Sequence, residues 1–186
     1  DTVLSRGLGD VYKRQVIGAG SGGFSAAITA AEKGLSVVII GEGMIGGTCV
    51  NVGCVPSKTM IRATEAIHHA NNASCFDGIE ANAKITDWKA LVAQKQALVE
   101  ELRGAKYIDV LPSYKNISYI EGRAVFKNNG VIANDVLYTP KKVIIATGSS
   151  ASIPPIDGIN DVPYLTSTTA FCLLYTSPSP RDKTVS

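Results

Sequence analysis

The sequence predicts an α/β fold built around a parallel sheet, and three observations lead to this prediction. Residues 16–40, "VIGAGSGGFSAAITAAEKGLSVVII", pass from an apolar strand through closely spaced glycines into a helical pattern and then into a second apolar strand. This is the order of a βαβ unit. Two longer helical patterns follow, and from residue 116 apolar residues recur with the period of two that short strands show. We therefore expect a Rossmann-like domain with a helical pair and a small β-meander.

The first turn of the βαβ unit carries a glycine motif, in which Gly18, Gly20 and Gly23 have the spacing G-x-G-x-x-G. The first glycine permits the tight turn, the second lets the backbone approach a pyrophosphate, and the third lets the helix pack on the strand, with the anion at the helix N-terminus. Gly34 is placed to end that helix. Its expected buried face consists of Phe24, Ala27, Ile28 and Ala31. The pattern favours a dinucleotide site over a purely structural glycine turn.

The second strand, residues 36–40, is short, β-branched and apolar on both faces, as a buried parallel strand is. In a dinucleotide site such a strand should end in an acidic residue that holds a ribose hydroxyl. Gly41 stands at that position and Glu42 follows it. Either Glu42 reaches the ribose, or backbone groups and water replace that contact.

The next segment, "GGTCVNVGCVPSK", places Cys49 and Cys54 five positions apart, directly after a glycine pair. Because proline is tolerated in the first turn of a helix, we expect a helix to begin at Val55 or Pro56 and both thiols to lie at or just before its start. A thiolate there is stabilised by backbone N–H groups and the helix dipole, which makes it reactive. The pair could therefore close and reopen a small disulfide ring and accept two electrons. The alternatives are a structural disulfide and a zinc site, for which no second close cysteine pair supplies ligands.

The helical region that follows contains few further candidates for chemistry. The adjacent His68 and His69 point to different sides of a helix, and we interpret both as ordinary helix residues; Cys75 fills a core gap or lies near the surface without a role. Asp87 is expected to cap a long helix over residues 88–111. The buried side of that helix is predicted to hold Trp88, Leu91, Val92, Leu98, Val99 and Leu102. Beyond it, short strands are expected at 117–126, 130–133, 135–139 and 141–150.

Composition and charge exclude several classes of protein. The 186 residues are 45% apolar and carry a net charge of +2, so the chain lacks the basic field of proteins that bind nucleic acids or anionic membranes. No apolar run approaches the ~20 residues of a membrane-spanning helix, and no signal peptide is recognisable. Four cysteines do not form the dense framework of a secreted disulfide-rich domain. We expect a cytoplasmic protein with no nucleic-acid and no membrane partner.

The two ends differ in character from the chain between them. Residues 5–15, "SRGLGDVYKRQ", and residues 172–182, "CLLYTSPSPRD", resemble the translated adapter of a sequencing library, one end being the reverse complement of the other. We expect residues 1–15 and 172–186 to be non-native tails and residues 16–171 to be cut from a longer gene. An ordinary disordered tail is the alternative. If the tail must supply most of the first strand, the stability of the chain is doubtful.

Three motifs together carry a family resemblance. "GGTCVNVGCVPSK", with "GAGSGG" and "VIIATGSS", resembles the flavin-dependent pyridine nucleotide-disulfide oxidoreductases, and the resemblance covers residues 16–171. Within that family, "TCVNVGCVPSKTMIRA", "ELRGAKYIDVL", "GRAVFK" and "PYLTSTTAF" are most similar to the members that reduce Hg(II). Residues 16–171 would then be a partial FAD-binding domain.

The resemblance implies roles for matching positions. Gly18, Gly20 and Gly23 would hold the FAD pyrophosphate, and Glu42 would contact a ribose. The other implied cofactor contacts are Gly47 and Thr48 along the cofactor, Lys58 near the reactive edge of the isoalloxazine, Ala124 at the adenine end, and Thr147 with Gly148 near the flavin.

The implied mechanism is a relay from NADPH through FAD to a Cys49–Cys54 disulfide. Cys54 would be the thiolate against the flavin, Cys49 the outer interchange thiol, and the reduced pair would bind Hg(II) transiently as substrate before its release as elemental mercury. A dihydrolipoamide dehydrogenase or a glutathione reductase-like enzyme is the alternative. The NADPH domain and the contacts of an expected homodimer would lie outside this chain. By itself the chain would be inactive, a non-catalytic FAD-binding module or an unfolded fragment.

Overall fold

The computed structural model of the protein describes residues 14–127 and 130–171. They form two compact units: the sheet unit, made of residues up to 51 and residues 100–150, and the helical unit, made of residues 52–99 and the residues from 151 onward. Apart from Arg14 and Gln15, the predicted non-native tails lie outside the described residues.

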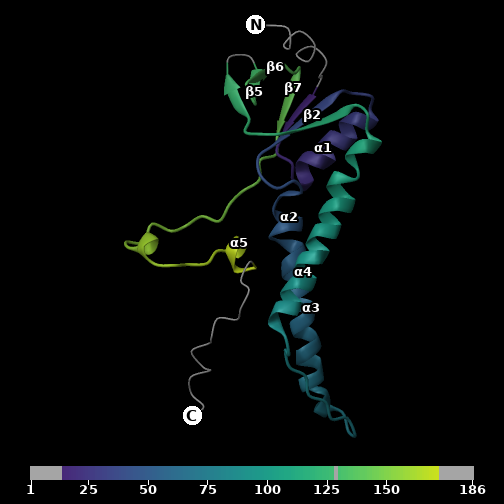
Figure 1. Cartoon of the computed structure of the whole chain (residues 1–186), viewed down its shortest axis with the longest axis vertical. Coiled ribbons are helices and arrows are strands. Elements are labelled where there is room, and N and C mark those ends of the chain that lie inside the picture. Colours follow the sequence, from purple (N-terminus) through teal and green to yellow (C-terminus); the bar gives the residue numbers. More distant parts are fainter. Residues whose placement is uncertain (1–13, 128–129, 172–186) are drawn as a thin grey trace. The chain divides into compact units, whose positions relative to one another are not determined.

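The sheet unit is built on four parallel strands in the order β3-β2-β1-β7. Their bounds are β1 Arg14–Ile17, β2 Val37–Gly41, β3 Ile117–Glu121 and β7 Lys142–Ile145. Helix α1, Ser21–Glu32, connects β1 to β2 and packs on one face of the sheet through Phe24, Ala27 and Ala31 (Figure 1). Every residue of β2 is buried, because α1 covers one face and the meander covers the other. The predicted βαβ unit is confirmed.

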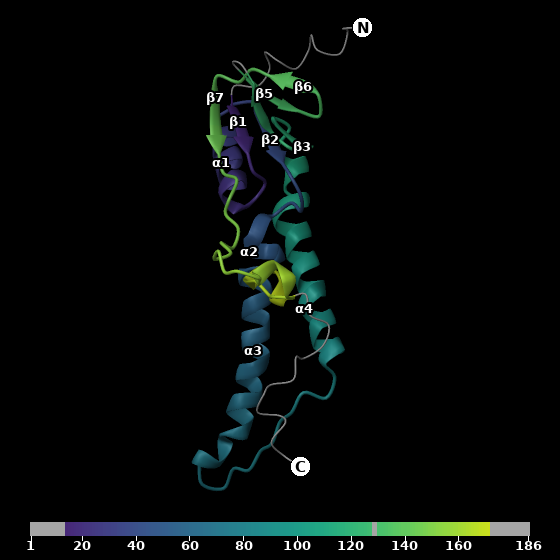
Figure 2. The same ribbon diagram turned by 90° about the vertical axis from the view of Figure 1, so that its left-hand side faces the viewer.

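The opposite face of the sheet is covered by an antiparallel meander (Figure 2). It consists of β4 Val125–Lys127, β5 Gly130–Ala133 and β6 Val136–Tyr138, paired in that order. Asn134 and Asp135 make the turn between β5 and β6 with φ angles of 49° and 62°, which asparagine and aspartate tolerate better than most residues. The buried cluster between sheet and meander contains Ile17, Val38, Ile40, Val131, Ala133 and Tyr138.

One strand prediction is wrong in its pairing. Residues 117–126 were expected to form a single strand, but the chain leaves the parallel sheet after Glu121 and enters the meander at Val125. At the break, the Gly122 N–H donates to the Gly41 carbonyl at 2.9 Å, and the Asn134 side chain donates to the Glu121 carbonyl at 2.9 Å. These two bonds hold the bend that separates the strands.

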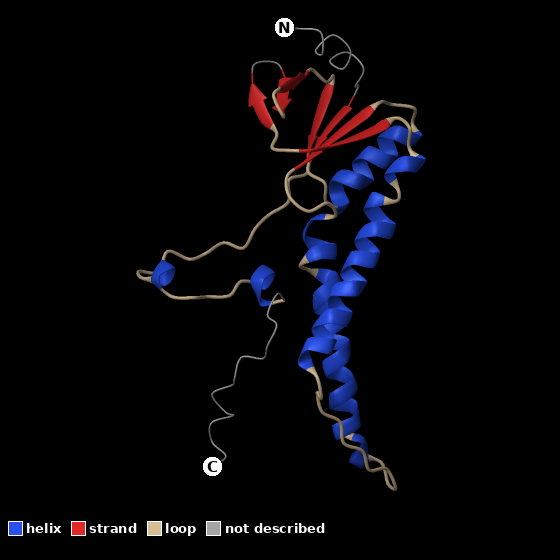
Figure 3. Cartoon of the chain, in the orientation of Figure 1, coloured by secondary structure: helices blue, strands red, loops and turns tan. Residues whose placement is uncertain are grey.

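The helical unit contains α3 Cys54–Asn71 and most of α4 Trp88–Arg103, which run in opposite directions (Figure 3). Short helical turns at Ala73–Cys75 and Ile159–Asp161 and helix α5, Ser167–Ala170, complete it. Helix α3 begins at Cys54, slightly before the predicted start. None of the helices within the described ranges combines the length and the apolar character that crossing a membrane requires.

Helix α4 begins as predicted, because the Asp87 carboxylate accepts a hydrogen bond of 3.0 Å from the Ala90 N–H. It ends earlier than predicted, at Arg103, and continues as a π-helical turn, Gly104–Ile108, and a 3-10 turn, Leu111–Ser113. Val92 and Val99 are buried as expected, whereas Trp88, Leu91, Leu98 and Leu102 are half-buried. Lys95 is buried on the same helix, and its ammonium donates to the Phe171 carbonyl at 2.8 Å.

Candidate functional site

A cavity of about 910 Å³ opens in the sheet unit at the carboxyl ends of β1, β2 and β7. This is the edge at which parallel α/β sheets bind ligands, and the volume lies within the usual range of small-molecule and cofactor sites. Its wall comes from the turn after β1, the loop after β2, the first residues of α2 (Gly47–Asn51), the segment between β3 and β4, and the loop after β7.

The turn after β1 is shaped by close backbone approaches. Gly18 has a φ of +112°, and a Cβ there would overlap the Ala146 carbonyl. Its N–H donates to the Ile40 carbonyl at 2.8 Å. Gly23 lies behind the cavity wall, where a Cβ would overlap the Gly18 carbonyl. The first and third glycines therefore fix the turn and the helix packing, and the N-terminus of α1 is left open toward the cavity.

A second glycine loop lies against the first. The Gly46 N–H donates to the Ala19 carbonyl at 2.8 Å, and Gly20 and Gly46 form a parallel bridge. Gly47 has a φ of +65°, and a Cβ on it would lie 2.8 Å from the Gly20 Cα. Only glycine fits this contact, which brings Thr48 and Cys49 of α2 onto the cavity wall.

Two further segments complete the wall. Gly122, Arg123 and Ala124 contribute from the bend between β3 and β4, facing the side of the cavity where Glu42 follows β2. Across the cavity, the Ala146 N–H donates to the Ile17 carbonyl at 2.7 Å, which places the loop after β7 beside the glycine turn.

The predicted site residues fall into three groups. Nine line the cavity: Gly18, Gly20, Glu42, Gly47, Thr48, Cys49, Ala124, Thr147 and Gly148. Gly23 packs behind it. Cys54 and Lys58 belong to the helical unit, and both are exposed.

Sequence reasoning missed several wall residues. They are Ser21, Gly22, Met44, Gly46, Gly122, Arg123 and Ser149. All are sequence neighbours of the motifs that were identified, so a wider window around each motif could have found them.

The described cysteines, Cys49, Cys54 and Cys75, all lie at exposed positions. Within residues 14–127 and 130–171, no group of three or more His, Cys, Asp or Glu side chains could hold a metal ion. Of the three cysteines, Cys49 is the one that lines the cavity.

The wall fits a dinucleotide. The N-terminus of the twelve-residue helix α1 faces the cavity without an acidic residue in its first turn, so its backbone N–H groups and dipole favour an anion. Gly18, Gly20 and Gly22 leave the approach to that helix end free of side chains. Glu42 offers an acceptor for ribose hydroxyls, and Arg123 adds a positive charge.

Comparison with known proteins agrees with this geometry. The family described as pyridine nucleotide-disulphide oxidoreductase matches residues 12–179. The chain belongs to this family. The family takes its name from a pyridine nucleotide and a disulphide.

Individual relatives and solved structures lie within the same family. The chain is 43% identical to a mercuric reductase of Lysinibacillus sphaericus over 95% of its own length and 32% of the relative, and 46% identical to a mercuric reductase of Shigella flexneri over 83% and 28%. An HOCl-induced flavoprotein disulfide reductase from Escherichia coli superimposes with a TM-score of 0.72 at 30% identity, covering 88% of this chain and 34% of that one. The chain thus spans about a third of the length of the relatives it matches.

Proposed function

We propose that the chain is the FAD-binding, redox-active-disulfide part of a flavoprotein that uses NADPH to reduce Hg(II) to elemental mercury. The observation that carries the proposal is that Cys49 and the glycine turn share one cavity wall. The choice of Hg(II) as substrate is supported by the mercuric reductases among the relatives, at 43% to 46% identity.

The cavity residues would hold FAD along its length. The pyrophosphate would lie at the N-terminus of α1 between Gly18 and Gly20, the ribose hydroxyls would donate to Glu42, and the adenine end would meet the backbone at Ala124. At the flavin end the contacts would come from Gly47, Thr48, Thr147 and Gly148, with Lys58 near the reactive edge. When bound, FAD would carry two electrons from NADPH to the cysteine pair.

The two thiols would perform the substrate chemistry. A Cys49–Cys54 disulfide that takes up two electrons and two protons becomes a dithiol, and the dithiol loses both protons when its sulfurs bind Hg(II). Thiolate sulfur suits this ion because soft metals prefer soft ligands. Two further electrons, supplied by a second NADPH through the flavin, would convert bound Hg(II) to Hg(0), which no longer forms stable thiolate bonds and leaves the two thiolates behind.

A disulfide substrate is the second candidate, and the structural likeness to a flavoprotein disulfide reductase favours it. Dihydrolipoamide dehydrogenase-like and glutathione reductase-like activities belong to this class. We further propose that residues 16–171 are part of an FAD domain, that NADPH binds elsewhere in a longer protein, and that this protein is a cytoplasmic homodimer.

The first experiment purifies the chain in the presence of FAD, removes free FAD and records the flavin spectrum. About one retained FAD per chain is expected, and Gly20→Val should abolish retention by blocking the approach of the pyrophosphate. Ser25→Val, on the exposed side of the same helix, is the matched control and should retain FAD. A colourless wild-type product would refute the proposed binding.

The second experiment counts thiols before and after mild reduction. Two additional thiols are expected in the wild type and none in Cys49→Ser. An equal count in the wild type before and after reduction would refute the proposed redox pair.

A further inference from the structure

The side-chain amide of Asn51, at the end of α2, closes the loop that leads to Cys49. Its nitrogen donates to the Ile45 carbonyl at 3.0 Å and to the Gly47 carbonyl at 2.9 Å. These carbonyls flank Gly46, which is itself bonded to the turn after β1. The amide therefore fixes the loop and the first turn of α2 as one piece.

Arg103 holds that amide from outside the loop. Its guanidinium Nη1 donates to the Asn51 amide oxygen at 3.1 Å and lies 3.4 Å from the Met44 sulfur. Both N–H groups and the oxygen of the Asn51 amide are thereby engaged. An arginine at this position selects the amide orientation in which the nitrogen faces the two carbonyls.

Tyr107 makes the corresponding contact to the other loop of the cavity. Its hydroxyl shares a hydrogen bond of 2.9 Å with the Ser21 hydroxyl, at the first residue of α1. The buried ring packs edge-to-face on Phe24, with centroids 5.0 Å apart and an interplanar angle of 89°. A Cβ on Gly46 would lie 3.2 Å from the ring, so the tyrosine also defines the space beside the glycine loop.

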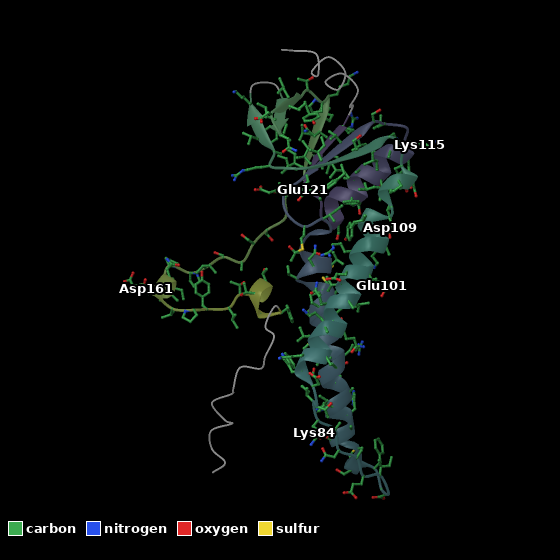
Figure 4. All side chains as sticks on the ribbon, in the orientation of Figure 1. Lys84, Glu101, Asp109, Lys115, Glu121 and Asp161 are labelled. Atoms are coloured by element: carbon green, nitrogen blue, oxygen red, sulfur yellow. The ribbon has the colours of Figure 1, made fainter. Side chains whose placement is uncertain are left out.

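The backbone explains why these two residues act together. Arg103 is the last residue of α4 and Tyr107 lies in the π-helical turn that follows. Residues four apart on a helix share a face, and π-helical turns occur often at functional sites. The turn is closed by the Asp109 N–H, which donates to the Gly104 carbonyl at 3.0 Å. Glu101 and Asp109, labelled in Figure 4, mark the stretch that carries the pair.

We propose that Arg103 and Tyr107 are positioning residues for the proposed FAD and thiol site. Arg103 fixes the Cys49 helix through Asn51, and Tyr107 fixes the N-terminus of α1 through Ser21. One helical segment thereby fixes two of the segments that line the cavity. The inference rests on the proposed function for its ligand, whereas its effect on the loops can be measured without one.

The test compares Arg103→Met and Tyr107→Phe with Lys106→Met, a control that removes a positive charge from an exposed position in the same turn. Hydrogen–deuterium exchange is measured over residues 44–51 and 18–24 without FAD, together with the rate at which iodoacetamide alkylates Cys49. Arg103→Met is expected to speed exchange in 44–51 and alkylation of Cys49 by about fivefold, the factor that one hydrogen bond contributes to an equilibrium. Arg103→Lys, which keeps a donor, should restore most of the wild-type rate.

Two more measurements separate positioning from general stability. Tyr107→Phe should raise the FAD dissociation constant by about fivefold and speed exchange in 18–24 while leaving the Cys49 alkylation rate unchanged. Adding Arg103→Met to Asn51→Ala should produce no further change in alkylation, because Arg103 acts on the loop through the Asn51 amide. Uniform acceleration of exchange along the chain would overturn the inference, since that is the signature of a weaker fold.

The failures of the inference and of the proposed function are distinguishable. If the wild type retains FAD and the variants behave like Lys106→Met, the inference is wrong and the function stands. If the wild type retains no FAD but the exchange and alkylation effects occur as expected, the positioning role stands and the proposed function is wrong.

Discussion

The buried side chain of Gln15 allows a test of how the core of the sheet unit is packed. It lies in β1, an inner strand of the parallel sheet, and pairs with Val38 of β2 and Val143 of β7. Ile17, two residues further along the same strand, belongs to the cluster beneath the meander. Because residues two apart in a strand point to the same face, Gln15 also lies on the meander side of the sheet. Its exposed fraction is 0%, and neither its amide nitrogen nor its amide oxygen has a hydrogen-bond partner among residues 14–127 and 130–171.

The cost of this burial can be estimated. A buried polar group without a partner costs about 1–3 kcal/mol, and methionine has nearly the same length and shape as glutamine without these groups. We expect Gln15→Met to raise the free energy of unfolding by about 2 kcal/mol. For a chain of this size that corresponds to a rise in the melting temperature of roughly 4–8 °C.

The assay is urea unfolding followed by circular dichroism, with the m-value as a check that the unfolded state is unchanged. Gln94→Met, at an exposed position of α4, is the matched control and should stay within about 0.5 kcal/mol of the wild type. Gln15→Glu should unfold the sheet unit, because an unpaired charge would be buried. An unchanged or lower midpoint for Gln15→Met at constant m would refute the reasoning, since it would mean that the amide is satisfied.

The same residue bears on the proposal that residues 1–15 are foreign to the gene. Gln15 is the last residue of the adapter-like segment, and it is a polar residue at a position where both neighbouring strands supply valine. An apolar side chain would suit this buried position better than glutamine, and the boundary at residue 16 stays a prediction.

Three further outcomes follow from the structure. Gly18→Ala should weaken the fold and abolish FAD retention together, because its Cβ would overlap the Ala146 carbonyl; melting temperature and flavin absorbance measure the two effects. Asp87→Ala should lower the free energy of unfolding by about 1 kcal/mol through loss of the helix cap, as measured by urea unfolding, and Asp87→Asn should lose less. Burial and then the charge of Glu121 raise the pKa of Tyr119. The protonated Tyr119 hydroxyl therefore contributes fully to stability below the unfolded-state pKa of about 10. This contribution is lost as the pH rises through the higher folded-state pKa. Tyr119→Phe should flatten the fall of the urea midpoint between pH 9 and 11, and an identical fall in both proteins would contradict the assignment.

The sequence predicted those parts of the fold that are governed by local pattern. The βαβ unit is marked by apolar periodicity and by glycines, and the start of α4 by Asp87, so both could be recognised within a few residues. The division of residues 117–126 could not be recognised in the same way. β3 is an edge strand whose residues are mostly half-buried. The periodicity of such a strand does not reveal which sheet it joins.

The same distinction between local pattern and long-range contact applies to the candidate site. The cavity wall near each motif follows from the motif, because the glycines and Cys49 are brought together by backbone contacts close to the carboxyl ends of the strands. The contacts of Arg103 and Tyr107 join side chains 52 and 86 positions apart. Nothing in the spacing of a single sequence encodes such pairs, and the buried Lys95 was missed for the same reason.

The departure from the expected acidic residue at the end of β2 has a steric cause. A Cβ at Gly41 would lie 2.5 Å from the Ala19 Cβ and 3.3 Å from the Tyr119 hydroxyl. While those two residues keep their places, the end of the strand admits no side chain, and an acidic group must come from the next position. Glu42 lines the cavity from there. The glycine at 41 and the acid at 42 thus fit the steric limit set by Ala19, which favours Glu42 over water as the proposed ribose contact.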